Sequence, residues 1–516
     1  MKKAFLLALT LAAALPSAPR AEAPGSDPYS QGMALRRKGD YAGAKAVFLE
    51  MLAKDPKSGG AFEGLGLTCL SLKEYAQARD YLSRWNESRP NSGYILGLLA
   101  RADAELERRD EYLADLRGAA AADPMDLGLH RRLDGVQRER PGVLPEARMY
   151  KSLSNEGLET GSPQRVVYEG RSGGAKARFG VHPKAELLLG YSAREEAQRN
   201  DTNGFTYFDI LEQVASVGAA LRPRKGLDLE AEYGQSFLSD VHKAGVGRKS
   251  FSRLRLAGEW RAPAATVRLK AGREPYFLRG AGGSQYFALL REAYANAEVE
   301  AYRWGWGGLL RGGLDDYSDH TTLRRWSAAA FREFGENYIH LSYGQSHQEF
   351  FGADAAGRIR FAAYDRLGAR WRWLREDFAR IDAGYGWSRY RDGNRLHDAS
   401  IGLALAVPRV KGLSAEYRIE AYDYLGPADG YRSTDWTEHW AGPHWRRMVE
   451  PGLWTHLAAE HGWARDTRGG YEGNLALAEL EYYWRERASL LLSGKLRRST
   501  LRDESYSLGL SGRWTF

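Results

Sequence analysis

YSLGLSGRWTF, residues Tyr506 to Phe516, is the clearest strand pattern in the sequence. Its large side chains fall on one parity and its small or polar ones on the other: Tyr506, Leu508, Leu510, Trp514 and Phe516 alternate with Ser507, Gly509, Ser511, Arg513 and Thr515. Successive side chains of a strand point to opposite faces, so this pattern predicts a strand with one apolar and one polar face. An edge strand of a soluble sandwich is the alternative interpretation.

The same alternation recurs from about residue 165 to the end. Leu227, Leu229 and Ala231, for example, alternate with Asp228, Glu230 and Glu232. Short connections such as Phe334-Gly335-Glu336 alternate along the chain with longer polar or Gly-rich connections such as Leu425 to Ser433. This arrangement predicts one antiparallel transmembrane β-barrel of about 18 strands, with about 16 to 20 possible because Val166 to Tyr191 can be divided in two ways.

Composition agrees with a barrel in a membrane. The mean hydropathy of −0.53 is low, but a barrel strand faces lipid only at every second residue. The 15 Trp, 29 Tyr and 58 Gly suit aromatic girdles, turns and crowded walls. The net charge of +8 comes without a separate basic run, so no nucleic-acid partner is predicted.

The N-terminal residues 1–23 have the layout of a secretory signal peptide. Lys2 and Lys3 precede the apolar run AFLLALTLAAAL, and Pro16 and small residues follow. Export is therefore expected, with cleavage after Ala18 or Ala23. Cys69 is the single cysteine, which excludes an intramolecular disulfide and a multi-cysteine metal site. No cofactor and no metal are expected.

Residues 27–151 show helical periodicity and an internal repeat. The spacing is 34 residues between Pro56, Pro90 and Pro124, between Gly32, Gly66 and Ala100, and between Phe48, Leu82 and Leu116. This period and these positions resemble the tetratricopeptide-repeat family. We predict an α-solenoid of about three repeats with a capping helix near Leu127 to Glu139, a linker at 152–164 and the barrel at 165–516. Cys69 is expected to be a buried structural thiol.

A short helical solenoid binds other proteins in its concave face. Its candidate partner-binding residues are Tyr41, Tyr75, Tyr81 and Trp85. The same side chains also suit packing between helices, so both interpretations stay open.

The polar parity of the barrel strands is predicted to line a lumen, because lipid would cover the apolar parity. The candidate pore-lining residues are Asp228, Glu230, Glu232, Arg253, Arg255, Arg261, Arg268, Lys270, Glu298, Glu300, Arg370, Arg372, Glu416 and Arg418. They could form ion pairs that stabilise the wall, or a transverse field and hydrogen-bonding track for a polar polymer. Inward aromatics, among them Tyr422 and Trp454, could stack on sugars or simply fill space.

No enzyme is predicted. His340 and Ser342 share one parity, and His456 and Glu460 share another. Neither pair has a third partner that spacing can identify, so neither makes a catalytic set.

The leader, the repeats, the barrel and the terminal aromatic together resemble the outer-membrane exopolysaccharide-export proteins, such as the poly-N-acetylglucosamine porin and the cellulose-export protein. SRYRDGN, residues 388–394, is similar to a loop motif in those barrels. The resemblance implies a polysaccharide substrate, insertion into outer-membrane lipid by the barrel-assembly machinery, and a periplasmic N-terminal domain that docks periplasmic or inner-membrane secretion partners. Those relatives have longer repeat arrays than this chain.

A second resemblance is to the surface-lipoprotein assembly modulator family, which combines a similar short repeat domain with a barrel and implies protein translocation. A non-conducting adhesin or receptor barrel is a third possibility.

Overall fold

The computed structural model describes residues 27–90, 92–106, 108–138, 141–156, 164–201, 206–224, 226–241, 247–262, 264–279, 287–303, 305–318, 321–353, 359–375, 378–391, 393–425, 435–466, 469–484, 487–500 and 504–515. The predicted signal peptide and Phe516 lie outside these ranges. No helix within them is both long enough and apolar enough to cross a membrane.

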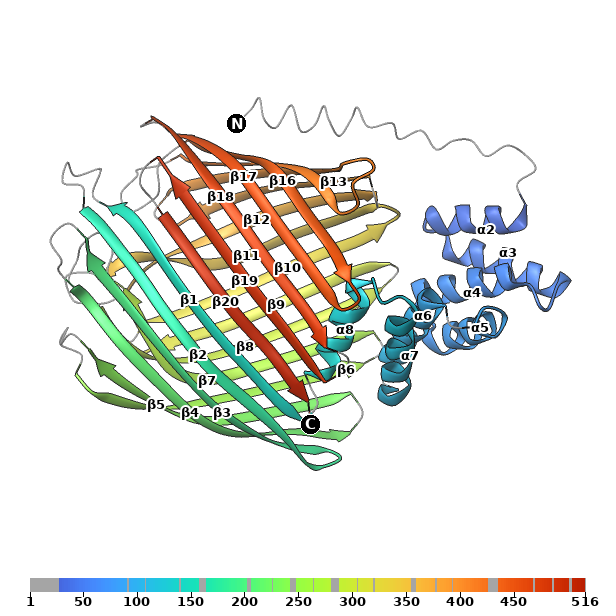
Figure 1. The fold of residues 1–516 in the computed structure, drawn as a ribbon, viewed down its shortest axis with the longest axis horizontal. Helices are drawn as coiled ribbons and strands as arrows, with labels where there is room; N and C mark the ends of the chain where they lie inside the picture. The colour runs from blue at the N-terminus through green and yellow to red at the C-terminus, as the bar shows by residue number, and fades with distance from the viewer. Residues whose placement is uncertain are drawn as a thin grey trace.

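The N-terminal part of the described chain is a stack of seven helices (Figure 1). They are α2 (Pro28–Arg37), α3 (Tyr41–Lys54), α4 (Gly59–Leu72), α5 (Tyr75–Ser88), α6 (Gly93–Glu105), α7 (Arg109–Ala122) and α8 (Leu127–Gln137). Side chains cap several of them: Asp40, for example, accepts a hydrogen bond from the backbone N–H of Gly43, which satisfies one of the free donors of α3.

The 34-residue spacing corresponds to close helix contacts. A Cβ on Gly32 would lie 2.5 Å from the Phe48 ring, and one on Gly66 would lie 2.6 Å from Leu82. The predicted small residues therefore allow the helices of a pair to approach. Cys69 is fully buried in the core, and burial raises the pKa of its thiol to about 12, so the predicted structural role is confirmed.

The rest of the described chain is a 20-stranded antiparallel sheet. The strands are β1 (Gly142–Glu156), β2 (Gln164–His182), β3 (Ala185–Asn200), β4 (Thr206–Arg224), β5 (Leu227–Asp240), β6 (Lys249–Ala262), β7 (Ala265–Arg279), β8 (Phe287–Arg303), β9 (Trp306–Tyr317), β10 (Thr322–Phe334), β11 (Asn337–Ala353), β12 (Ile359–Arg375), β13 (Ala379–Tyr390), β14 (Arg395–Ala406), β15 (Leu413–Tyr424), β16 (Trp436–Glu450), β17 (Leu453–Asp466), β18 (Gly469–Trp484), β19 (Ala488–Ser499) and β20 (Glu504–Thr515).

The sheet closes between its first and last strands. β1 pairs with β2 on one side and with β20 on the other, where Met149 faces Leu508. Each remaining strand pairs with its sequence neighbours. The predicted barrel is confirmed, with 20 strands in place of about 18.

β1 accounts for part of the difference in strand number. It occupies residues that were expected to end the helical domain and begin the linker, so the barrel starts at Gly142 and not at 165. Its alternation is weak because Pro145 and Lys151 fall on the apolar parity. The pairing of β1 with β20 skips Leu144 and Pro145, because Pro145 has no N–H to donate to the ladder.

Candidate functional site in the barrel lumen

The two faces of the barrel wall differ as the alternation predicts. Leu256, Leu269 and Leu492 on the apolar parity are 45%, 55% and 48% exposed. The opposite face is concave. Lys176 of β2 lies 2.8 Å from Glu232 of β5, although β3 and β4 lie between them. Strands are about 4.8 Å apart, so these side chains can meet only by converging toward the barrel axis.

All fourteen candidate pore-lining residues lie on this concave face, on β5, β6, β7, β8, β12 and β15. Cross-strand pairs link them, such as Glu232 with Arg255 and Arg268 with Glu298. The spacing of two within each strand and the strand-to-strand register together determine this common orientation.

Most of these charges are engaged with one another. Arg268 contacts Glu259 at 3.0 Å, Glu298 at 2.6 Å and Glu300 at 3.2 Å. Other ion pairs around the wall are Lys176 with Glu230, Arg261 with Asp228, Arg253 and Arg255 with Glu274, Arg372 with Asp382, Arg418 with Glu460, and Arg446 with Glu416. This geometry matches wall-stabilising ion pairs better than a strong transverse field.

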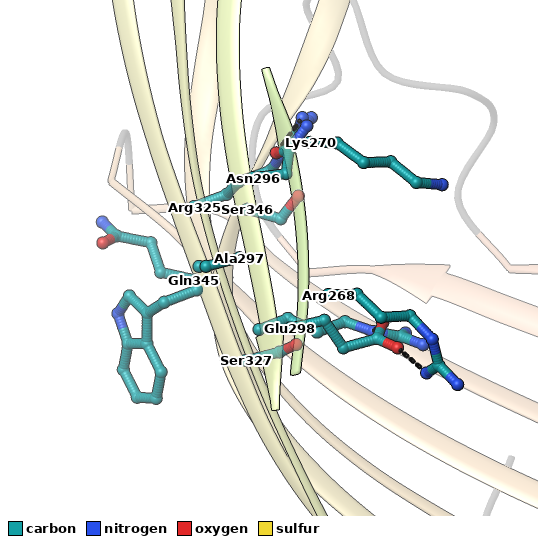
Figure 2. A pocket seen from close by; sticks show the side chains of 12 residues that line it. Arg268, Lys270, Asn296, Ala297, Glu298, Arg325, Ser327, Gln345 and Ser346 are labelled. Carbon is teal, nitrogen blue, oxygen red and sulfur yellow. Dashed lines mark hydrogen bonds and ion pairs between the residues drawn. The ribbon is translucent and has the colours of Figure 1, made fainter. Parts of the chain in front are cut away.

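Lys270 and Arg370 differ from their neighbours. Neither has an ion pair within 4.0 Å among the described residues. Lys270 borders a hollow of about 410 Å³ with Arg268, Asn296, Glu298, Arg311 and Arg325. In Figure 2 its side chain extends into open space, while Arg268 and Glu298 are joined. These two cations are therefore available to a solute in the lumen.

The helix α8 attaches the helical domain to one side of the barrel. Asp134 accepts a hydrogen bond from Arg513 of β20 at 2.7 Å. Arg131 binds Glu481 of β18 and lies 4.8 Å from the centre of the Trp454 ring. His130 stacks on Tyr483 at 5.4 Å. The residues predicted as a capping helix thus contact the barrel, which sequence reasoning did not identify.

A second contact lies on the other side of the barrel. The ammonium group of Lys73, which follows α4, lies 3.4 Å from the centre of the Tyr302 ring at the end of β8. β8 and β18 are ten positions apart in a closed order of 20 strands, so the two contacts lie on opposite arcs. The helical domain therefore spans the barrel end that holds the short turns (Figure 1).

A buried polar chain crosses three strands of the wall. His444 lies 2.9 Å from Glu460 and 3.2 Å from His456, and His456 lies 2.9 Å from Glu479. The structure thus brings His456 and Glu460 together through His444, while His340 and Ser342 lie on β11. The strand register creates this chain, and spacing within one strand gives no signal for it.

Three of the four candidate partner-binding residues pack between helices. Trp85 is 4% exposed in the core between helices, and Tyr75 and Tyr81 pack against the same cluster. Tyr41 is half-buried at the start of α3.

Comparisons with known proteins support the repeat domain. The tetratricopeptide-repeat family model matches residues 35–102. No curated protein matches the chain. MamA, residues 41 to the end, from Desulfovibrio magneticus RS-1 is a similar solved structure at 27% identity and a TM-score of 0.21, over 22% of this chain and 64% of that chain.

Solved barrels also match. The siderophore receptor PirA from Pseudomonas aeruginosa has a TM-score of 0.43 and 11% identity, over 73% of this chain and 81% of that chain. The FrpB iron transporter from Neisseria meningitidis has a TM-score of 0.43 and 9% identity, over 73% and 82%. None of these likenesses bears on what this chain binds. The closed barrel with an apolar exterior is itself of the outer-membrane type.

Proposed function

We propose that this protein is an outer-membrane conduit through which a secreted polysaccharide leaves the cell. The observation that carries the proposal is a closed barrel with a polar, charge-paired lumen, whose end with the short turns is spanned by a helical repeat domain. In bacterial barrels the short turns face the periplasm, so the helical domain is periplasmic in this proposal.

The electrostatics of the lumen suit a polar polymer. Conduction requires binding that is favourable enough for entry and weak enough for exit. Because Arg268, Arg261 and Lys176 are already engaged with carboxylates, they offer hydrogen bonds without a deep electrostatic trap. Lys270 and Arg370 add local positive charge.

The helical domain lies at the end of the barrel through which the polymer would enter. Repeat domains of this kind bind protein partners, so a periplasmic or inner-membrane secretion partner that docks on it would deliver polymer directly to the lumen. We propose that the barrel passes the polymer without chemistry. His444 and His456 are both buried and both engaged with carboxylates, so neither is free to act on a polymer.

Proteoliposomes that contain the purified protein test the proposal. Fluorophore-labelled neutral, anionic and cationic hexasaccharides are enclosed and their efflux is measured, alongside channel conductance in planar bilayers. Efflux of at least one sugar class, altered when Arg253, Arg255 and Arg268 are replaced by Ser, is the expected result. No efflux of any sugar would contradict the proposal. Release of an enclosed unfolded lipoprotein would then favour translocation of the assembly-modulator type.

A further inference from the structure

Six aromatic side chains line one arc of the lumen at the end away from the helical domain. They are Tyr364, Tyr390, Tyr422, Tyr424, Trp436 and Tyr471, and they are called here the outer aromatic arc. Cross-strand pairing places Tyr364 opposite Tyr390 and Tyr422 opposite Trp436. The parity of each strand directs all six toward the lumen.

The rings form two series between β12 and β18, which meet where Tyr422 packs against the cluster of Tyr390 and Tyr424. Tyr364 and Tyr390 have ring centres 5.1 Å apart, and Tyr390 and Tyr424 follow at 6.3 Å. Tyr422 and Trp436 are 5.9 Å apart with planes only 14° from parallel. Trp436 and Tyr471 are also 5.9 Å apart, at 21°.

The members of the arc differ in burial. Tyr390 and Tyr424 are 3% and 8% exposed and form the base of the cluster. Tyr364, Tyr422, Trp436 and Tyr471 are only half-buried, so they present ring surface to the lumen. A cluster that only filled space would not need this exposed surface on four of its six members.

The wall beside the arc is electrically balanced. Gly384, Gly386 and Ser388 occupy successive inward positions of β13, and the side chains of Arg366 and Asp398 lie over Gly386. Arg366 binds Asp398 at 2.7 Å, so this cation is neutralised by its neighbour. Trp436 adds an indole N–H that is buried without a hydrogen-bond partner in the described part of the chain.

We propose that the outer aromatic arc is a binding subsite for uncharged pyranose rings, either neutral hexose or N-acetylhexosamine units of the exported polymer. This inference rests on the proposed conduit function. A pyranose ring has an apolar C–H face that packs on the flat faces of aromatic rings, while its hydroxyl groups find polar partners nearby. Because the charge of Arg366 is neutralised by Asp398, it does not favour an anionic sugar over a neutral one.

Titration calorimetry of the full-length protein in detergent tests the subsite. The probes are cellohexaose, chitohexaose and hexagalacturonate. We expect a neutral hexasaccharide to bind, and hexagalacturonate to bind at least about tenfold more weakly. The double variant Tyr422→Ala/Trp436→Ala should lose at least about tenfold in affinity for the neutral hexasaccharide, which is the order of magnitude of a lost stacking contact with an aromatic side chain. Tyr422→Phe/Trp436→Phe keeps the rings and should restore binding.

Trp463→Ala is the matched control. Trp463 lies on the neighbouring strand β17, but on the outward parity, where it stacks on His439. Its removal should leave sugar affinity unchanged. Far-UV circular dichroism and the heat-dependent gel shift of the barrel check that each variant is folded.

The outcomes separate the subsite from the conduit. Sugar efflux with no hexasaccharide binding, or with binding that the double Ala variant retains, overturns the subsite and leaves the conduit standing. An equal loss of sugar affinity in Trp463→Ala also overturns the subsite. Binding that depends on the arc without efflux of any sugar supports the subsite and contradicts the conduit.

Discussion

Asp134 of α8 and Arg513 of β20 form a buried ion pair of 2.7 Å, although 379 residues separate them in the chain. Arg138 adds a second hydrogen bond of 2.7 Å to the same carboxylate. Burial acts to raise the pKa of Asp134, but hydrogen bonds that include those from Arg513 and Arg138 outweigh it and hold this pKa below its ordinary value. The helical domain is thereby fastened to the last strand of the barrel.

Replacement of Asp134 by Asn should loosen this attachment. Loss of one partner from a buried ion pair costs about 3–5 kcal/mol, because the other charge stays buried and unpaired. Hydrogen exchange of the full-length protein should show faster exchange in α8, with the barrel strands unchanged. Arg132→Gln, on the exposed face of α8, is the control. Equal exchange in all three proteins would contradict the role of the ion pair.

The helical domain should become less stable as the pH rises from about 4 to about 6, because the carboxyl group of Asp115 loses its proton over this range. Burial, and then the nearby carboxylate of Asp103, raise the pKa of Asp115 to about 6 from its ordinary 3.8. A raised pKa means that the protonated form is favoured in the folded state. The stabilisation of the folded state by protonated Asp115 is complete below pH 3.8 and is lost as the pH rises through about 6.

Asp115→Asn cannot titrate and tests this pH dependence. We expect a higher thermal midpoint than wild type at pH 7, and a difference that shrinks toward about pH 4, followed by circular dichroism at 222 nm. A wild-type thermal midpoint that rises between pH 4 and pH 6 would contradict the predicted direction of this pH dependence.

Gly66→Ala should destabilise the second repeat. The added Cβ would lie 2.6 Å from Leu82, and overpacking of this kind costs about 1–3 kcal/mol. Gly135→Ala is the matched control, because nothing lies within 4 Å of its added Cβ and Ala in a helix gains about 0.5–1 kcal/mol. Thermal melting at 222 nm should move in opposite directions for the two variants.

Lys270→Glu should change the ion selectivity of the lumen. The ammonium group of Lys270 has no ion pair among the described residues, so its reversal changes the local potential directly. We expect the cation-to-anion permeability ratio to rise severalfold, as measured by reversal potentials in a salt gradient. The double variant Arg372→Gln/Asp382→Asn leaves the net charge unchanged, although it removes the contacts of Asp382 with both Arg372 and Arg380, and should change the ratio little.

The faces of the barrel could be predicted because side-chain alternation is a local property of a strand. Leu229 and Glu230 point to opposite faces whatever their strand pairs with. Likewise, the 34-residue step predicts that Gly66 and Leu82 belong to one helix pair, since helix packing within a repeat depends on nearby residues.

Other features depend on contacts between distant residues. The pattern of β1 is obscured by Pro145 and Lys151, and only its pairing with β2 and β20 reveals it as a strand. The chain from Glu460 through His444 and His456 to Glu479 exists because of the register of three strands. One residue of slip would move any of these side chains to the other face.

Local periodicity alone thus establishes a repeat domain, a barrel and a polar inner face. The closed sheet settles the number of strands, the partners of each charge, the continuity of the outer aromatic arc and the position of α8 beside β18 and β20. The reason is physical: periodicity describes which way a side chain points from its own backbone, whereas register and closure determine what it meets there.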